Sequence, residues 1–141
     1  MQRCPHIFAV QTIEADFFQL LSPQSCVYNI FGKYEYHPQK IANNHNIVFL
    51  SGGNGMNQNG IRWFLKDVFP VIRNRFADAR LLIGGSICKA MPELKNYEGV
   101  EVQGYVGDPA VFYAQADVCI NPCYQGTGLK IKTFEAISYD K

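Results

Sequence analysis

Short apolar runs alternate along the chain with segments whose apolar residues recur at helical spacing. The runs cover residues 6–10, 26–31, 47–50, 80–85, 100–104 and 117–122, and each has the length of a strand. Periods near 3.6 residues predict helices over 12–21, 57–75 with a kink at Pro70, and 89–94, and two more after Asp108 and after Gly128. This alternation predicts an α/β fold, a doubly wound Rossmann-like parallel sheet with helices on both faces.

Glycine-bearing turns follow the runs that start at residue 47 and later, at 51–55, 84–85, 104–108 and 121–128. Ligands of such sheets bind beyond the carboxyl ends of the strands, so we expect these turns to converge on one crevice. Glycine also serves simply to make tight turns and helix ends. We expect the pair Gly84 and Gly85 to be purely structural.

The stretch 126–136 carries the strongest indication of chemistry. A strand, a glycine turn and a helix in succession aim free backbone N–H groups and the positive end of a helix dipole at one point, which suits a phosphate. Lys130 and Lys132 add positive charge in the expected first turn, where the dipole alone favours acids, and this suggests an anionic ligand. The alternative is a surface ion pair between Lys132 and Glu135, which lie on one helical face.

Composition narrows the classes of function. The 141 residues are 48% hydrophobic and 18% charged, with a formal net charge of +1, so no basic field favours nucleic acid or an anionic membrane. No apolar run approaches the length of a bilayer span, and the first residues do not form a signal peptide. The five cysteines include no Cys-x-x-Cys pair, and His6, His37 and His45 lack metal-ligand spacing. We therefore expect a cytoplasmic protein with reduced thiols and no bound metal.

Six blocks, taken in order, resemble the donor-binding, C-terminal half of GT-B glycosyltransferases of the retaining family-4, or group 1, type. They are residues 46–53, 59–65 with 68–72, 81–85, 99–106, 117–122 and 126–136. The resemblance predicts a nucleotide-sugar-binding domain over 46–141. Residues 1–45 resemble, more weakly, the end of the acceptor-binding half and a linker. Relatives continue past residue 141 into another buried strand and closing helices, so we expect a truncated donor domain and an acceptor-binding half beyond this chain.

The resemblance implies transfer of a sugar from a UDP- or GDP-sugar to a hydroxyl of a glycan, lipid or small molecule, with retention of configuration. The nucleotide-sugar is a substrate, and no tightly bound cofactor is expected. The residues implied to bind it are Gly52, Gly53, Asn54, Tyr105, Val106, Thr127, Gly128, Leu129, Lys130, Lys132 and Glu135.

Each group of these residues has an implied role. Glu135 accepts hydrogen bonds from the ribose hydroxyls, the base lies against Tyr105 and Val106, and the turn 52–54 approaches the phosphates and the sugar. Backbone N–H groups of 127–129 bind the diphosphate, and Lys130 and Lys132 are the candidates for stabilising it as it departs. No catalytic residue is assigned, because a catalytic histidine of the family type would come from the other half.

Two departures from the family pattern stand out. Many relatives carry a glutamate where Thr127 stands, and an Arg and a Lys after the first strand, where this chain has 53–55 and Asn57. A subgroup with a Gly-Thr-Gly-Leu-Lys-Ile-Lys type of motif shares both features, so we hypothesise that Lys130 and Lys132 take over charge neutralisation.

Other classes of function remain open. One is a non-catalytic nucleotide- or phosphate-binding α/β module, or an inactive fragment. Another is a GT-B sugar-nucleotide epimerase, which would need catalytic acids and a histidine that the sequence does not place. We expect the chain alone to bind donor weakly and not to transfer sugar.

Overall fold

The computed structural model describes residues 4–30, 32, 35–38, 40, 42–126 and 128–141. The chain divides into two compact units, Met1–Tyr34 and Glu35–Lys141. The assignment of 1–45 and 46–141 to two halves of a larger fold stays a prediction.

The first unit is a strand, a helix and a strand: β1 (His6–Ala9), α1 (Thr12–Leu21) and β2 (Cys26–Asn29). The two strands pair in parallel, with His6 opposite Cys26. These elements confirm the predicted order. The helix N-cap is Gln11, with no side-chain hydrogen bond, and Thr12 is the first helical residue.

The second unit contains a parallel four-stranded sheet with the order β5-β4-β3-β6. Its strands are β3 (Asn46–Leu50), β4 (Arg80–Gly84), β5 (Val100–Gly104) and β6 (Val118–Cys119). The chain moves outward from β3 through β4 to β5 and then returns to pair β6 with the other edge of β3. The order of strands therefore reverses between β3 and β6, and ligands of open α/β sheets bind beyond the carboxyl ends at such a point.

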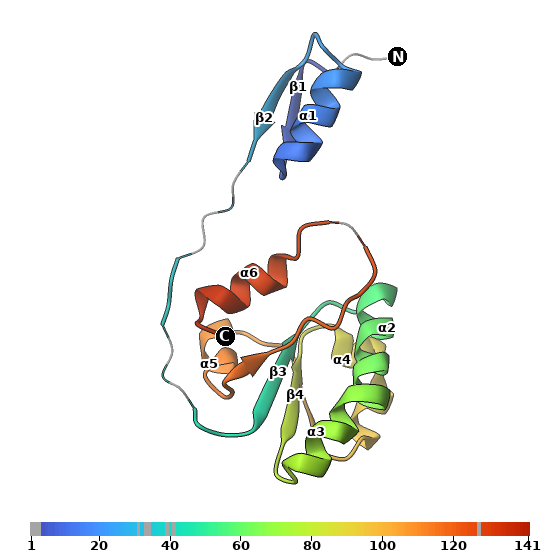
Figure 1. Cartoon of the computed structure of the whole chain (residues 1–141), viewed down its shortest axis with the longest axis vertical. Coiled ribbons are helices and arrows are strands. Elements are labelled where there is room, and N and C mark those ends of the chain that lie inside the picture. The colour runs from blue at the N-terminus through green and yellow to red at the C-terminus, as the bar shows by residue number, and fades with distance from the viewer. Residues whose placement is uncertain (1–3, 31, 33–34, 39, 41, 127) are drawn as a thin grey trace. The chain divides into compact units, whose positions relative to one another are not determined.

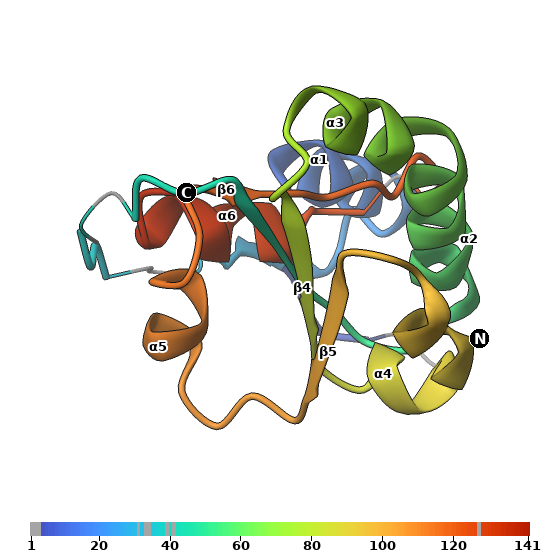
Figure 2. The same ribbon diagram turned by 90° about the horizontal axis from the view of Figure 1, so that it is seen from below.

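Helices cover both faces of this sheet, as the sequence predicted (Figures 1 and 2). One face carries α2 (Gly55–Trp63), η1 (Phe64–Val68), α3 (Phe69–Arg75), α4 (Ile87–Ala90) and η2 (Pro92–Asn96), and the other carries α5 (Pro109–Tyr113) and α6 (Ile131–Ser138). Successive residues of β3 serve the two cores: Ile47 and Phe49 pack under α2 and α3, and Val48 packs under α5 and α6. An uninterrupted apolar run is what such a doubly covered strand requires.

The helix predicted over 57–75 is unbroken from Gly55 to Arg75 but changes type along its length. Its middle, Phe64–Val68, is a π-helical turn in which the Phe69 N–H donates to the Phe64 carbonyl. Pro70 has no N–H to donate to the preceding turn, and a local change of helical type accommodates this loss. The kink predicted at Pro70 is thus a π-helical turn that ends just before it.

The last elements start later or are shorter than predicted. β6 has two residues, and α6 begins at Ile131 with Lys130 as its N-cap. Gly128 and Leu129 therefore lie in the loop before the helix, so their N–H groups are not those of its first turn. Thr127 lies outside the described residues. The helix predicted after Asp108 is α5, and Asp108 caps it, since its carboxylate accepts from the Ala110 N–H at 2.9 Å.

Gly85 lies in one of the predicted turns and contacts two others, at Ser51 and at Gly104. Its φ is +97°, and a Cβ there would collide with the backbone of Ser51. Its N–H donates to the carbonyl of Gly104 at 2.6 Å. The structural role predicted for this glycine therefore has a physical basis in backbone conformation and close packing.

Candidate functional site

Two neighbouring cavities lie beside α6 at the carboxyl ends of the strands of the second unit. The Tyr105 cavity, of about 490 Å³, is lined by Gly52, Tyr105, Val106, Lys132 and Glu135 among others. The Lys130 cavity, of about 270 Å³, is lined by Asn54, Gly128, Leu129, Lys130 and Lys132 among others. Ile131 and Lys132 line both, so the first turn of α6 stands between them. Of the remaining predicted residues, Gly53 lines neither cavity and donates its N–H to Ser86 Oγ at 3.1 Å.

Lys132 points inward at the place where the two cavities meet. Its Nζ donates to Asn57 Oδ1 at 2.6 Å and to Ser51 Oγ at 3.1 Å, and it lies 3.7 Å from Cys123 Sγ. The ammonium also lies 5.5 Å from the centre of the Phe49 ring, in cation–π range. No described residue forms an ion pair with Lys132, so the predicted alternative of a Lys132–Glu135 pair is wrong. All partners of this cation are neutral.

Glu135 is half-buried one turn further along α6 and lines the Tyr105 cavity. The hydroxyl of Tyr113 lies 3.5 Å from Glu135 Oε2, a long hydrogen bond. Burial, with the nearby charges of Cys119 and Glu135, raises the pKa of Tyr113 well above its usual value, so this hydroxyl stays a donor. Burial first, and the charge of Glu135 second, raise the pKa of Cys119 to about 11, while the charge of Lys132 opposes the rise. The charges of Glu135 and Lys132 thus both reach Cys119 in β6.

Lys130 has a different environment from Lys132. Its Nζ donates to the carbonyl oxygens of Gln125 and Gly126, at 3.2 and 3.1 Å. Gly126 has a φ of +86°. The ammonium of Lys130 therefore closes the loop in front of α6, whereas that of Lys132 lies beneath the helix.

The turn after β3 and the start of α2 are held by asparagines. Asn54 caps α2 through Oδ1, which accepts from the Asn57 N–H at 2.9 Å. Gly60 brings α2 against the turn after β6, since a Cβ at this position would lie 2.8 Å from the Pro122 carbonyl oxygen. Helix α2 and the turn after β6 are therefore in direct backbone proximity.

Sequence reasoning missed Ser51, Asn57 and Cys123, the neutral partners of Lys132. Asn57 entered the prediction only as a position where relatives carry a cation. The signal that was present is its place three residues after the cap Asn54, in the first turn of a helix that faces the crevice.

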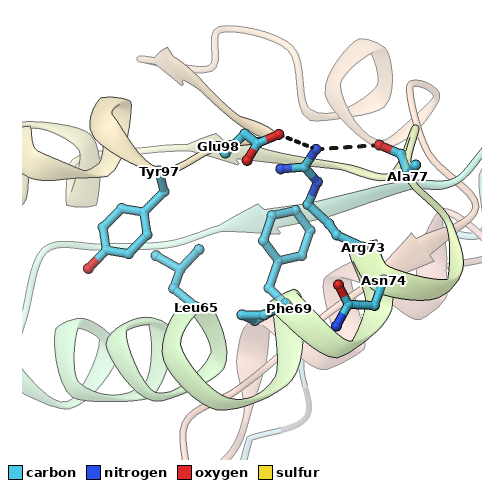
Figure 3. Close-up of a pocket in the computed structure, with 8 residues that line it drawn as sticks. Leu65, Phe69, Arg73, Asn74, Ala77, Tyr97 and Glu98 are labelled. Atoms are coloured by element: carbon cyan, nitrogen blue, oxygen red, sulfur yellow. Dashed lines mark hydrogen bonds and ion pairs between the residues drawn. The ribbon is translucent and has the colours of Figure 1, made fainter.

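A third cavity, of about 400 Å³, lies at the opposite, amino-terminal end of the sheet (Figure 3). Arg73 of α3 spans it and donates to Glu98 at 2.9 Å and to the Ala77 carbonyl at 3.4 Å. The charge of Arg73 is thus balanced within the chain, and we assign no ligand to this cavity.

Two further properties concern only the described residues. None of their clusters of His, Cys, Asp and Glu could hold a metal ion. None of their helices combines the length and the apolar composition needed to cross a membrane.

A parallel α/β sheet with convergent turns at its switch point defines a Rossmann-like domain, and one class of such domains forms each half of GT-B glycosyltransferases. Residues 44–141 match the family model described as glycosyl transferases group 1. The chain therefore belongs to the group 1 glycosyl transferases. The family predicted from the six sequence blocks is confirmed.

The fold is similar to that of the pneumococcal O-GlcNAc transferase GtfA, whose crystal structure is a complex with UDP and GlcNAc. The TM-score is 0.71 at 13% sequence identity, over 95% of this chain and 28% of GtfA. At this identity the likeness is one of fold, and it matches a Rossmann-like half of the GT-B architecture. The chain thus spans 28% of the length of this solved relative. No curated protein matches the chain.

Proposed function

We propose that the second unit binds the nucleotide-sugar donor of a retaining glycosyltransferase, with the diphosphate at Lys132. The observation that carries this proposal is the half-buried Lys132 ammonium, which has only neutral partners and lies between two cavities at the switch point of the sheet. A cation removed from water is normally balanced by a carboxylate. Here no carboxylate neutralises the ammonium, so a ligand would have to do so, and a diphosphate carries the negative charge required.

The two cavities differ in a way that supports a direction for the donor. The Tyr105 cavity would take the nucleoside, since it offers the ring of Tyr105, which is 89% exposed, for a base, and the carboxylate of Glu135 for two ribose hydroxyls. The Lys130 cavity would take the sugar, since it offers side-chain amides, including Asn54, Asn121 and Gln125, and none of its described lining residues is an acid. Amides donate to and accept from sugar hydroxyls without adding charge.

Lys132 has the chemistry needed for the reaction as well as for binding. Departure of the diphosphate develops negative charge on the oxygen that leaves the sugar. A fixed ammonium, with hydrogen-bond donors held in place before the reaction, stabilises that charge without reorganisation. The acceptor, a hydroxyl of a glycan, lipid or small molecule, and the group that activates it belong to a part of the enzyme outside these cavities.

A two-dimensional amide NMR titration with UDP and GDP tests the proposal. We expect shifts at Gly53, Tyr105, Gly128 and Glu135, larger for the diphosphate whose base the site accepts. GtfA was solved with UDP, and this favours UDP as the first ligand to try. Lys132→Ala and Glu135→Ala should keep a dispersed spectrum and lose the shifts. A wild-type spectrum that does not respond to millimolar nucleotide contradicts the proposal.

A second candidate is binding without catalysis. It is favoured by the linings of the two cavities, in which the described residues include no histidine and Glu135 as the one acid. A coupled assay of UDP release from UDP-sugars tests the chain for catalysis of its own. We expect the chain alone to bind but not to release UDP, and release would contradict binding without catalysis, because it would place catalytic groups within the chain itself.

A further inference from the structure

We propose that Asn57 is a positioning residue for Lys132, which it holds with a neutral oxygen so that the positive charge stays available to an anion. The nature of that anion rests on the proposed function, but the contact between Asn57 and Lys132 does not. Neither residue is a neighbour of the other in sequence, and they meet only through the fold.

Three hydrogen bonds hold the side chain of Asn57 in place. It is 7% exposed, and its Oδ1 accepts from Lys132 Nζ at 2.6 Å and from Cys123 Sγ at 2.8 Å. Its Nδ2 donates to the carbonyl of Gly52 at 2.9 Å. The orientation of the amide is fixed by chemistry, because a lysine ammonium can only donate and a backbone carbonyl can only accept.

These bonds connect three segments that the sequence separates. Asn57 in α2 contacts the turn after β3 at Gly52, the turn after β6 at Cys123, and the first turn of α6 at Lys132. The approach of α2 to Pro122 at Gly60 fixes the same arrangement through the backbone. The position of the ammonium is therefore set before any ligand arrives.

An amide is the side chain that satisfies both demands at position 57. An aspartate would neutralise Lys132 and place a carboxylate against the Gly52 carbonyl, which then loses its donor. A leucine of similar size would remove the principal acceptor of the ammonium and leave Ser51 Oγ as its remaining oxygen partner. Only the amide holds the cation without cancelling its charge.

Opposite changes at Asn57 give the proposal a direct test in the full chain. Acetic anhydride labels lysine amines, and peptide mass spectrometry reports the rate at Lys132 relative to Lys66 and Lys95. We expect Asn57→Leu to speed labelling of Lys132 roughly tenfold, since a hydrogen bond to a charged group is lost. Asn57→Asp should slow the labelling, because the new ion pair holds the ammonium more tightly.

The matched controls are Asn59→Leu and Asn59→Asp. Asn59 lies on the same helix, is exposed, and makes one 3.5 Å contact with Gln125. These variants repeat the changes in size and charge and should leave labelling of Lys132 within about twofold of wild type. Amide NMR spectra check folding, and if Asn57→Leu unfolds the chain, Asn57→Asp carries the test.

UDP affinity, measured on the same variants, separates this proposal from the proposed function. Both Asn57 variants should weaken UDP binding roughly tenfold and the Asn59 variants should not. Labelling that changes as expected while wild type binds no nucleotide supports the positioning and contradicts the donor site. Two results would contradict the role of Asn57. One is an unchanged labelling rate at Lys132 in the Asn57 variants, and the other is a UDP affinity that is the same in both Asn57 variants as in wild type.

Discussion

The two ends of the central sheet are built from the same strands but differ in how their charged side chains are partnered. At the amino end Arg73 pairs with Glu98 at 2.9 Å, and His45 pairs with Asp78 at 2.8 Å. At the carboxyl end Lys132 has neutral partners. Among the described residues, neither the two arginine–glutamate ion pairs nor the two histidine–carboxylate contacts include a residue that lines the Tyr105 cavity or the Lys130 cavity.

This difference indicates at which end of the sheet a charged side chain remains available to a ligand of opposite charge. A charged side chain that is paired within the protein contributes to stability and has little left for binding. A charged side chain held by neutral groups gains most when an ion of opposite sign arrives. We therefore expect the charged groups at the amino-end cavity to contribute to stability, and those at the carboxyl-end cavities to contribute to ligand binding.

The largest effect is expected from replacing Lys132, in the first turn of α6, and comparing it with Lys130, the N-cap of the same helix. Lys132→Met should weaken UDP binding by about 100-fold, the effect of losing a charge-assisted contact in a partly desolvated site. Lys130→Met should weaken it only a few-fold, since the Lys130 ammonium already binds two carbonyl oxygens of its own loop. Isothermal titration calorimetry gives both values, and equal losses would remove the distinction between the lysines.

Alkaline pH tests the electrostatics under α6. The folded state raises the pKa of Cys119 from 9.0 to about 11, mainly through burial, so the neutral thiol is favoured. Its contribution to stability is fully present below pH 9.0 and is lost as the pH rises to about 11, where the loss amounts to about 2–3 kcal/mol. Urea unfolding of wild type and Cys119→Ala across this range should show a smaller loss in the variant. Parallel curves for the two proteins would contradict this origin.

Tyrosines at the two ends offer a matched pair. Tyr105 lines the Tyr105 cavity at the carboxyl end, and Tyr97, which is 40% exposed, lines the cavity at the amino end. Tyr105→Ala should weaken UDP binding about fivefold, as expected for loss of stacking on one base. Tyr97→Ala should leave the affinity unchanged, and a similar loss from Tyr97→Ala would break the contrast between the two ends.

The smallest effect is expected at Arg73. Its partner Glu98 is 87% exposed, so Arg73→Met should cost about 1 kcal/mol or less in the free energy of unfolding. UDP affinity should not change. Chemical denaturation and calorimetry together check both statements, and a change in affinity would show that the two ends are coupled.

The elements of the fold were readable from the sequence because apolar periodicity reports burial. The run 47–50 predicted a strand covered on both faces, and Ile47, Val48 and Phe49 are all buried. Asp108 followed by Pro109 predicted a helix start, because cap chemistry is local. Such signals depend on residues close together in the chain.

The start of α6 and the π-helical turn were not readable in the same way. α6 begins at Ile131, after a loop that Lys130 closes by binding Gln125 and Gly126. A hydrogen bond from a side chain to a loop carbonyl does not produce a periodic pattern of apolar residues, so the sequence does not reveal it. The π-helical turn depends on how Phe64 and Phe69 pack on the sheet as well as on Pro70.

Within the candidate site, the sequence predicted the turns and α6 but not how they are joined. Asn57 and Lys132 are 75 residues apart. Polar residues in a helix are usually exposed, so the residue type of Asn57 did not indicate that its side chain is buried. The roles of the site residues in binding stay predictions until a ligand is measured.

The close contact at Gly60 limits which substitutions the site can tolerate. A Cβ at this position would lie 2.8 Å from the Pro122 carbonyl oxygen, so any larger residue must push α2 away from the turn after β6. Asn57, one turn earlier on the same helix, would move with it. Tolerance to substitution is therefore narrower than the cavity linings suggest, because a residue that lines neither cavity sets the separation of the parts that do.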